Sequence, residues 1–308
     1  MTRLLEVRGL SRSFGALKAV DDNTFHVDEG EVVSIIGPNG SGKTTTINLL
    51  SGELAPDSGS IRFRGEDVAG RSPDAMARRG VRRTFQNGRV FGNATVAENV
   101  LLGQVPLARA ATPLPALRGI PVLRWVALIA EAALATVGTP GLRREKREAD
   151  ERVTTQLQRF STRLLPRREH PAWTLSYANR RRTEIARALA SAPGLLLLDE
   201  PTAGMNTAET KEVVRQLLDL KAEGQTMVIV EHKLELVMSV SDRVIVMDGG
   251  RVIADGPPAA VQNDERVIEA YLGKRRGGAA ARTHDVVAAV LDDDAANPPE
   301  TTDGEETR

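Results

Sequence analysis

Residues 37–44 read Gly-Pro-Asn-Gly-Ser-Gly-Lys-Thr and directly follow the apolar run Val-Val-Ser-Ile-Ile at 32–36. The apolar run is typical of a buried β-strand, and residues 44–50 are compatible with a helix. The glycines let consecutive backbone N–H groups curl around an anion, and a helix N-terminus adds unpaired donors and a favourable dipole. The stretch therefore predicts a phosphate-binding loop between a strand and a helix, rather than an ordinary glycine-rich turn.

The side chains of this loop suit a nucleotide that carries several phosphates. Lys43 is long enough to reach the β- and γ-phosphates, and the Thr44 hydroxyl is suited to bind Mg²⁺. We expect the loop and the residue after it to form one nucleotide-binding segment. Its expected nucleotide contacts are Gly37, Pro38, Asn39, Gly40, Ser41, Gly42, Lys43, Thr44 and Thr45.

A second group of chemically active residues ends another apolar run, Leu-Leu-Leu-Leu-Asp-Glu-Pro at 195–201. The leucines are expected of a strand that is buried on both faces of a parallel sheet. Such a strand delivers Asp199 and Glu200 to its C-terminal end, where ligands bind in open α/β sheets. Asp199 is suited to hold Mg²⁺, directly or through water, and Glu200 to polarise the water that attacks the γ-phosphate. Solvated acidic pairs are common at strand ends, so this assignment depends on the phosphate-binding loop.

The composition of the 308-residue chain restricts its partners. Lys plus Arg and Asp plus Glu both number 41, so no global basic field attracts nucleic acid. Cysteine is absent, which excludes disulfides and thiolate metal sites, and the 3% of aromatic residues disfavours base stacking. The charged N-terminus predicts no signal peptide. The apolar stretch at 121–137 carries Arg124 and Glu131, so we expect a packed or interfacial helix rather than a membrane span.

Further motifs follow a fixed order, and together they resemble those of the ATP-binding subunits of ABC transporters. Leu-Ser-Tyr-Ala-Asn at 175–179 is similar to the family signature. The resemblance implies that Ser176 and the backbone N–H of Ala178 grip the γ-phosphate of ATP held by an opposite subunit. Gln86 matches the glutamine loop, which contacts Mg²⁺ and water and senses the membrane partner.

Two more residues complete the resemblance. His232, in Ile-Val-Glu-His at 229–232, matches the switch histidine on the γ-phosphate, and Phe14 matches the aromatic that stacks on adenine. Taken singly, a Phe, Gln or His is more often a structural residue. The ordered set implies catalytic roles for Glu200, His232 and Gln86. By the same resemblance, the ligands of Mg²⁺ are Thr44, Gln86 and Asp199.

The resemblance narrows to the subgroup that takes up branched-chain amino acids. It rests on Arg-Arg-Thr-Phe-Gln-Asn at 82–87, Thr-Val-Ala-Glu-Asn-Val at 95–100, Tyr177 and the ending Val-Ile-Glu-Ala-Tyr-Leu-Gly at 267–273. It covers about residues 4–273, less about 104–170. Three departures bear on catalysis and substrate. Ala178 replaces the family's usual glycine, Asn179 replaces a glutamine, and the apolar segment at 118–140 is longer than expected. If position 178 needs a positive φ, alanine costs about 1 kcal/mol there.

The fold expected from these features is α/β: a P-loop NTPase core with an antiparallel β subdomain and an inserted helical subdomain. One ATP-binding domain is expected over 1–273, with helices dominating about 88–190 and a disordered tail at 274–308. Expected strands cover 4–7, 24–27, 32–36, 60–64, 81–85, 195–198, 226–230, 243–247 and 251–254. Expected helices cover 72–79, 95–102, 143–163, 179–190, 207–221, 234–240 and 264–272.

The resemblance implies a function and a set of partners. The chain would bind and hydrolyse ATP with Mg²⁺ in an importer of branched-chain amino acids or related small polar solutes. It would pair with a second, identical or related, ATP-binding subunit and sit on the inner face of the membrane through integral-membrane permease subunits. A solute-binding protein would act on the permease, and no nucleic acid partner is expected. Open alternatives are export or transport of another solute such as urea, amides or lipid, a soluble ABC ATPase acting on ribosomes or DNA, and a non-hydrolysing nucleotide-dependent regulator.

Overall fold

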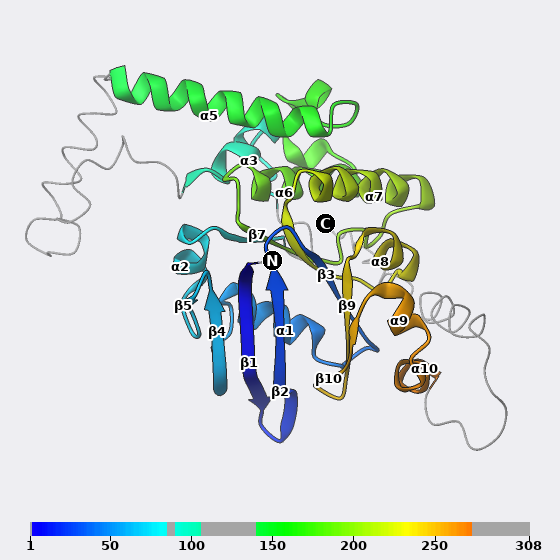
Figure 1. Ribbon diagram of the computed structural model, residues 1–308. Helices are drawn as coiled ribbons and strands as arrows, with labels where there is room; N and C mark the ends of the chain where they lie inside the picture. The colour runs from blue at the N-terminus through cyan, green and yellow to red at the C-terminus, as the bar shows by residue number, and fades with distance from the viewer. Residues whose placement is uncertain (1, 85–89, 106–139, 273–308) are drawn as a thin grey trace, which may run out of the picture.

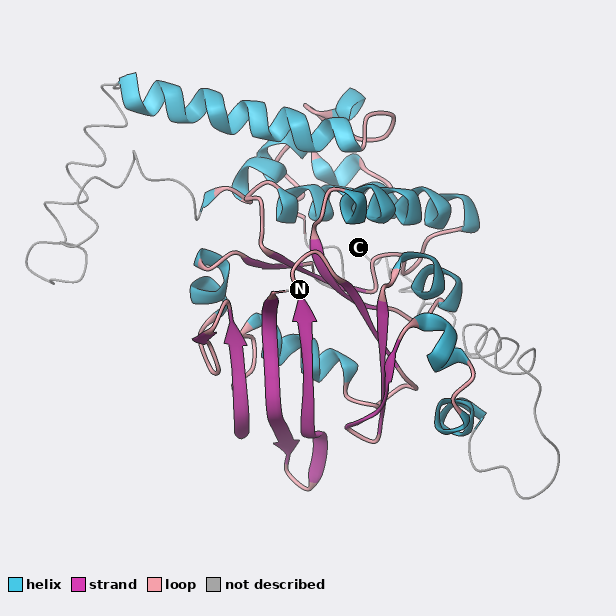
Figure 2. Cartoon of the chain, viewed as in Figure 1, coloured by secondary structure: helices cyan, strands magenta, loops and turns pink. Residues whose placement is uncertain are grey.

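The computed structural model describes residues 2–84, 90–105 and 140–272, and two β-sheets carry the core of this part of the chain. Figure 1 shows a smaller sheet beside a longer, twisted sheet, and helices that cover the second sheet. Figure 2 distinguishes the helices from the strands of the two sheets, and along the chain the two kinds of element alternate from residue 177 to residue 248. The α/β fold with an antiparallel β subdomain and a helical region is therefore confirmed.

The antiparallel sheet has the strand order β2-β1-β4-β5. The short strands predicted at 4–7 and 24–27 are wrong in extent, because β1 and β2 are each 12 residues long and pair as far as their connecting turn. The register shifts between Val7 and Leu10, around Gly9 with its φ of 58°, so a bulge carries the strand past the break in its apolar pattern. The strands are β1 (Arg3–Phe14), β2 (Leu17–Asp28), β4 (Ser58–Phe63) and β5 (Glu66–Asp67).

The second sheet has the order β10-β9-β3-β8-β7-β6. Among the described strands, those from β9 to β6 run parallel to one another, and β10 pairs antiparallel with β9. Gly249 and Gly250 join this final hairpin, with φ angles of 51° and 83° that suit a tight hairpin turn. The strands are β3 (Val32–Ile36), β6 (Val81–Arg83), β7 (Leu195–Asp199), β8 (Thr226–Val230), β9 (Arg243–Asp248) and β10 (Arg251–Gly256).

Two separate apolar cores lie on the two faces of this sheet, and β7 shows how. Successive side chains of a strand point to opposite faces. Leu195 and Leu197 pack with the antiparallel sheet and the first helix, whereas Leu196 and Leu198 pack with the helical region. All four leucines are fully buried. The continuous leucine run is thus explained by a strand that is covered on both faces, as predicted.

Helices connect most of the strands of the second sheet and pack on its faces. In Figure 1, α5, α6 and α7 lie together on one side of the molecule, and α1 lies behind β1 and β2. None of the helices within the described ranges is both long and apolar enough to cross a membrane. The helices are α1 (Lys43–Ser51), α2 (Pro73–Arg78), α3 (Val96–Leu102), α5 (Pro140–Arg159), α6 (Tyr177–Leu189), α7 (Thr207–Ala222), α8 (Leu234–Val240), α9 (Pro258–Gln262) and α10 (Glu265–Leu272).

Several predicted boundaries differ from the observed ones. The helix predicted over 143–163 begins at Pro140 and ends at Arg159, where the chain turns before Leu164. The strand predicted over 81–85 ends at Arg83, and α9 was not predicted because five residues hold too little periodicity. The apolar stretch at 121–137 and the tail at 274–308 lie outside the described residues. The domain limits of 1–273 and about 88–190 remain predictions.

Parallel pairing brings the chemically active segments to one edge of the second sheet. β3, β8 and β7 are neighbours, and the C-terminal ends of parallel strands lie at the same edge. The 37–44 loop follows β3, Asp199 ends β7, and His232 lies two residues beyond the end of β8. Segments that are almost 200 residues apart in the sequence therefore meet at a single site, since 232 − 37 = 195.

Candidate functional site

The glycines of the 37–44 loop are required by the space around them. Gly37 and Gly42 have φ angles of 151° and 101°, which favour glycine. A Cβ atom on Gly37 would lie 2.1 Å from the carbonyl oxygen of Met247, and one on Gly42 would lie 2.2 Å from that of Ala19. The loop is therefore pressed against the backbone of β9 and β2, and its shape leaves no room for side chains at these positions.

Lys43 opens α1 and reaches back into the loop. Its Nζ donates hydrogen bonds to the carbonyl oxygens of Gly37 at 2.7 Å and Pro38 at 2.9 Å. Burial lowers the pKa of the Lys43 ammonium, and the negative charges of Glu200 and Asp199 oppose that shift. The ammonium thus lies within the loop, near the two carboxylates, where phosphate oxygens can replace its carbonyl acceptors.

Asp199 is buried at the end of β7 and is ion-paired with Arg83 from the neighbouring strand β6. Arg83 Nη2 donates to Asp199 Oδ2 at 2.9 Å, and Arg83 Nη1 donates to Asn48 Oδ1 of α1 at 2.5 Å. The second carboxylate oxygen, Oδ1, is buried and has no hydrogen-bond partner among the described residues. Such an unsatisfied acceptor is rare and costly in a buried position, and it is what a metal ion or a metal-bound water would satisfy.

Glu200 adopts a backbone conformation that is uncommon for a residue with a side chain. Its φ angle is 48°, in the left-handed region, and its N–H donates to the carbonyl oxygen of Val230 at 2.8 Å. The side chain reaches His232, whose Nε2 lies 3.0 Å from the Glu200 Oε1. Strained backbone of this kind is concentrated at functional sites, and here it aims a partly exposed carboxylate at a histidine.

Glu231, next to His232, has a structural role that the sequence motif does not predict. Its buried carboxylate accepts hydrogen bonds from the backbone N–H groups of His232 at 2.9 Å and Thr202 at 3.1 Å, and from the Thr202 hydroxyl. Lys233, on the other side, donates to the carbonyl oxygens of Thr202 and Met205. The histidine loop and the loop after Glu200 are therefore fastened together by the neighbours of His232.

The residues of the 175–179 segment lie at the start of α6, apart from the loop of the same chain. Ser176 is exposed and caps α6, accepting from the N–H of Asn179 at 3.4 Å. Ala178 is buried in the first turn and is not among the described residues with positive φ, so the strain considered for alanine does not arise. Among the described residues, no hydrogen bond joins Ser176 to the 37–44 loop.

Two further candidates complete the set. Phe14 ends β1 with 46% of its surface exposed, and the Arg12 guanidinium lies 5.2 Å from its ring centre. Gln86 lies outside the described residues, so its predicted position in the site is not tested. The structure thus brings Lys43, Asp199, Glu200 and His232 to one edge of the sheet and leaves Phe14 on the antiparallel sheet.

The residues at this edge fit a hydrated Mg²⁺ better than a metal held by protein alone. Within the described ranges, no three His, Cys, Asp or Glu side chains are grouped closely enough to hold a metal. Mg²⁺ usually keeps several waters and takes one or two carboxylates plus substrate phosphates. Asp199 Oδ1 and the exposed Thr44 hydroxyl can supply such ligands beside a bound nucleotide. The buried Ser41 hydroxyl is also without a partner among the described residues.

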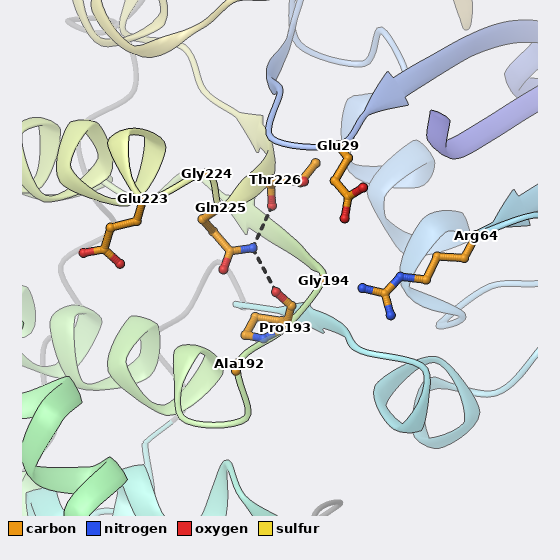
Figure 3. Close-up of a pocket in the computed structure, with 9 residues that line it drawn as sticks. All are labelled: Glu29, Arg64, Ala192, Pro193, Gly194, Glu223, Gly224, Gln225 and Thr226. Carbon is orange, nitrogen blue, oxygen red and sulfur yellow. Dashed lines mark hydrogen bonds between the residues drawn. The ribbon is translucent and has the colours of Figure 1, made fainter. Parts of the chain in front are cut away.

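A separate hollow of about 280 Å³ lies at the opposite ends of the strands. Figure 3 shows Glu29 and Arg64 beside the segment 192–194 that leads into β7, and Gln225 at the start of β8. The Gln225 amide donates to the carbonyl oxygens of Pro193 and Thr226, 3.0 Å each. Because this hollow is at the N-terminal ends of β7 and β8, it is not part of the site at Asp199 and His232.

Sequence reasoning missed Arg83 and Arg181, which hold the two carboxylate residues from either side. Arg181 Nη2 donates to the carbonyl oxygens of Asp199 and Glu200. A signal for Arg83 was available, because a cation that ends a strand adjacent to β7 must lie near the Asp-Glu pair. No local signal pointed to Arg181, which the sequence pattern places in a basic helix over 179–190.

Comparisons with known proteins agree with this geometry. The family model described as ABC transporter matches residues 20–203, and one described as Branched-chain amino acid ATP-binding cassette transporter matches residues 251–276. The BraF high-affinity branched-chain amino acid transport ATP-binding protein of Pseudomonas aeruginosa is 39% identical, over 88% of this chain and 98% of its own. The corresponding LivG protein of Salmonella typhimurium is 38% identical over the same shares. A nucleotide-free ATP-binding cassette superposes with a TM-score of 0.71 at 30% identity, covering 89% of this chain and all of its own.

Proposed function

Because the chain belongs to the ABC transporter family, in its group of branched-chain amino acid ATP-binding proteins, we propose that it energises import of branched-chain amino acids or related small polar solutes. It is an ABC ATPase, which binds ATP and hydrolyses it for transport. The observation that supports the site best is the meeting of the phosphate-binding loop, Glu200 and His232 at adjacent ends of β3, β7 and β8.

The nucleotide is held by the loop at 37–45. The backbone N–H groups of the loop and of the α1 N-terminus face the phosphates, and Lys43 exchanges its carbonyl acceptors for β- and γ-phosphate oxygens. Thr44, Asp199 and Gln86 would hold Mg²⁺, which when bound neutralises charge on the β- and γ-phosphate oxygens. Phe14 would stack on the adenine, since its ring is exposed on the antiparallel sheet.

Glu200 acts as the base toward water, and His232 fixes its direction. The carboxylate orients and polarises the water that attacks the γ-phosphate in line with the leaving group. The 3.0 Å contact to His232 limits the rotamers that Glu200 can adopt, and His232 then donates to the γ-phosphate when nucleotide is bound. Lys43 offsets the negative charge that develops on the phosphate oxygens.

The complete site needs a second subunit. Ser176 and the N–H of Ala178 lie at the exposed start of α6, where the first helical N–H groups have no intrahelical acceptors. An anion bound there would come from outside the chain, which supports a sandwich of two subunits around two ATP molecules. The second subunit is either another copy or a related ATP-binding protein.

Docking to permease subunits is supported by an exposed apolar surface around α3, which we name the α3 patch. Its Phe91 and Trp173 are 58% and 62% exposed, and the Trp173 N–H donates to the carbonyl oxygen of Gly92, next to Phe91. Large exposed apolar patches of soluble proteins often mark protein interfaces, and these exposed residues belong to α3 or to the segments beside it. This docking would place the chain on the inner face of the membrane, with a solute-binding protein acting on the permease. The α3 patch consists of Phe91, Leu101, Leu102, Val105 and Trp173.

The solute is proposed from the relatives, because we expect the contacts with the solute to lie in the permease and the solute-binding protein. BraF and LivG carry branched-chain amino acid transport in their names, and both match nearly their whole length. Transport of urea, amides or lipid is the alternative within the family, and a nucleotide-dependent regulator is the alternative outside transport. The regulator remains an alternative because Ala178 and Asn179 depart from the residues usual in the family signature.

Reconstitution tests the proposal directly. The chain is copurified with its membrane partners, inserted into liposomes with ATP and Mg²⁺ on the side of the chain, and supplied with the cognate solute-binding protein. We expect ATP-dependent uptake of leucine, isoleucine or valine, and none with the Glu200→Gln variant. Uptake of urea or an amide in place of these amino acids would reassign the solute. Copurification without membrane proteins, together with no hydrolysis, would favour the regulator.

A further inference from the structure

α6 contains two adjacent buried arginines, Arg181 and Arg182, although its sequence is that of a basic helix. Each has only 1% of its surface exposed. A guanidinium so far from water must be paired and hydrogen-bonded, because an uncompensated buried charge is strongly destabilising. Both arginines are hydrogen-bonded, but their partners lie in different elements of the fold. The two side chains therefore stabilise different parts of the structure.

Arg181 joins α6 to the end of β7. Its Nη1 donates to Oε2 of Glu184 at 2.7 Å, and Glu184 is itself 1% exposed. Its Nη2 donates to the carbonyl oxygen of Asp199 and, at 3.0 Å, to that of Glu200. The planar fork of one guanidinium thus connects a helix carboxylate to two consecutive peptide groups, a geometry that an ammonium group cannot reproduce.

These two peptide groups are the ones that set the direction of the Glu200 side chain. Glu200 has a left-handed backbone with a φ of 48°, which persists only where the surroundings hold it. Val230 accepts from the Glu200 N–H at 2.8 Å on one side, and Arg181 binds the carbonyl groups of Asp199 and Glu200 on the other. The backbone that aims the Glu200 carboxylate at His232 is therefore held by hydrogen bonds from both β8 and α6.

Arg182 provides an internal comparison. It donates to Oδ1 of Asn179 and to Oε2 of Glu212 in α7, both at 2.9 Å. Among the described residues, no hydrogen bond joins it to Asp199 or Glu200. Arg182 is as deeply buried as Arg181, in the same turn of the same helix, but it stabilises the packing of α6 on α7 rather than the end of β7.

We propose that Arg181 is a positioning residue for the proposed base: it keeps Glu200 in its left-handed conformation and so aims the carboxylate at the attacking water. The inference rests on the proposed role of Glu200. It also gives α6 a second task. Ser176 caps the start of the helix, so a movement of its N-terminus against an opposite subunit would be carried through Arg181 to the base of the same chain.

The test compares Arg181→Gln with Arg182→Gln in the full-length protein. For Arg181→Gln we expect single-turnover hydrolysis of ATP–Mg²⁺ to fall about tenfold or more, because a misplaced catalytic group reacts poorly. The Kd for ATP should stay within about threefold, since no side-chain hydrogen bond found among the described residues joins Arg181 to the predicted phosphate contacts. Both variants should lower Tm to a similar extent, because each removes a buried guanidinium. Arg182→Gln should nevertheless keep the hydrolysis rate within about threefold of the parent rate.

Hydrogen exchange supplies a readout that does not depend on activity. The amides of Asp199, Glu200 and Thr202 should exchange faster in Arg181→Gln than in Arg182→Gln, because only the first variant releases the peptide groups around Glu200. Equal exchange in the two variants would overturn the proposal. This measurement decides the role of Arg181 even if Glu200→Gln hydrolyses ATP at the normal rate, a result that would instead refute the proposed base.

A double-mutant cycle separates positioning from general damage. If Arg181 acts through Glu200, adding Arg181→Gln to Glu200→Gln should leave the slow residual rate unchanged within about twofold. A further loss as large as that seen with intact Glu200 would overturn the proposal. Should Arg181→Gln fail to fold, Arg181→Lys takes its place in every measurement. We expect this variant to lose about fivefold or more in rate, and a rate within about twofold of the parent would overturn the proposal.

Discussion

Nε2 of His232 lies 3.0 Å from Oε1 of Glu200, across the ends of the adjacent parallel strands β8 and β7. The contact is made possible by the left-handed backbone of Glu200, with its φ of 48°. A residue with an ordinary strand conformation at this position would direct its side chain along the normal alternation of β7. The pairing therefore results from a local departure from strand geometry at the point where chemistry is expected.

Lys43→Ala should remove tight nucleotide binding. The variant loses the only cation that the 37–44 loop directs at the β- and γ-phosphates, so the Kd for ATP should rise about 100-fold or more. Equilibrium titration with a fluorescent ATP analogue measures the change. Lys221→Ala, which removes a lysine paired with Asp242 far from the loop, should bind ATP normally. Unchanged affinity in Lys43→Ala would show that the loop is not the nucleotide site.

Gly42→Ala should disturb the loop by a steric clash in addition to the strain of its left-handed φ angle. Gly42 and Gly65 both have left-handed φ angles, but a Cβ on Gly65 meets nothing within 4 Å, whereas one on Gly42 lies 2.2 Å from the carbonyl oxygen of Ala19. Gly65→Ala should cost about 1 kcal/mol of stability and leave ATP affinity intact. Gly42→Ala should lose more stability and most of the ATP affinity. Thermal melts and titrations that failed to separate the two variants would contradict this argument.

Ala178→Gly should lower stability without lowering the ATPase rate. Ala178 is buried in the first turn of α6 and lacks the positive φ that would favour glycine. Glycine is a poor helix residue, so the free energy of unfolding should fall by up to about 1 kcal/mol. The backbone N–H is retained, so steady-state ATPase activity of the assembled transporter should be preserved. A tenfold loss of activity would mean that the Ala178 side chain has a catalytic task.

Glu212 should contribute stability that is lost in acid. The hydrogen bond from Arg163 and the charge of Arg182 hold the pKa of the Glu212 carboxyl below its usual value of 4.5. A lowered carboxyl pKa means that the folded state binds fewer protons, so the stabilisation is present above about pH 4.5 and disappears as pH falls through the folded-state pKa. Because the pair is partly exposed, the effect should be modest.

The matched variants for this test are Glu212→Gln and Glu235→Gln. Glu235 is exposed and forms no ion pair with the described residues. Thermal melts at about pH 6 and about pH 3 should show a smaller acid-induced loss of Tm for Glu212→Gln than for the parent protein. Glu235→Gln should follow the parent. Identical pH profiles for all three proteins would show that Glu212 does not contribute to the acid-induced loss of stability.

Much of the fold could be predicted because its central strands are apolar on both faces. β3, β8 and α8 were predicted with their observed limits, since each is a short, mostly apolar segment. The antiparallel strands were harder. Ser11, Arg12 and Ser13 obscure the alternation of β1, and the bulge at Gly9 shifts its phase. These features depend on pairing with β2 and β4, which local sequence does not encode.

The candidate site likewise contains residues that local sequence predicts and residues that only tertiary contacts bring to it. The loop glycines, Lys43 and the Asp199-Glu200 pair follow from local patterns, because their chemistry needs fixed spacing along the chain. The left-handed φ of Glu200 and the burial of Arg181 arise from contacts between elements far apart in sequence. No periodicity distinguishes Arg181 from an exposed arginine of a basic helix. The tertiary hydrogen bonds to Asp199 and Glu200 are what make it part of the site.

The central claim, that Glu200 is the base of an ATPase, predicts two separable effects of Glu200→Gln. The amide keeps the shape and loses the carboxylate that orients water, so ATP should bind normally and single-turnover hydrolysis should slow by about 10²-fold or more. Paired subunits should then accumulate with ATP–Mg²⁺ and not with ADP. Asp199→Asn is the control, and it should lose metal-dependent binding as well.

The most direct measurement is single-turnover hydrolysis of radiolabelled ATP by Glu200→Gln, with the subunit assembly of the same samples followed by light scattering. We predict slow hydrolysis, normal ATP affinity and ATP-dependent pairing. Hydrolysis at the parental rate, with no accumulation of paired subunits, would contradict the account and place the base elsewhere.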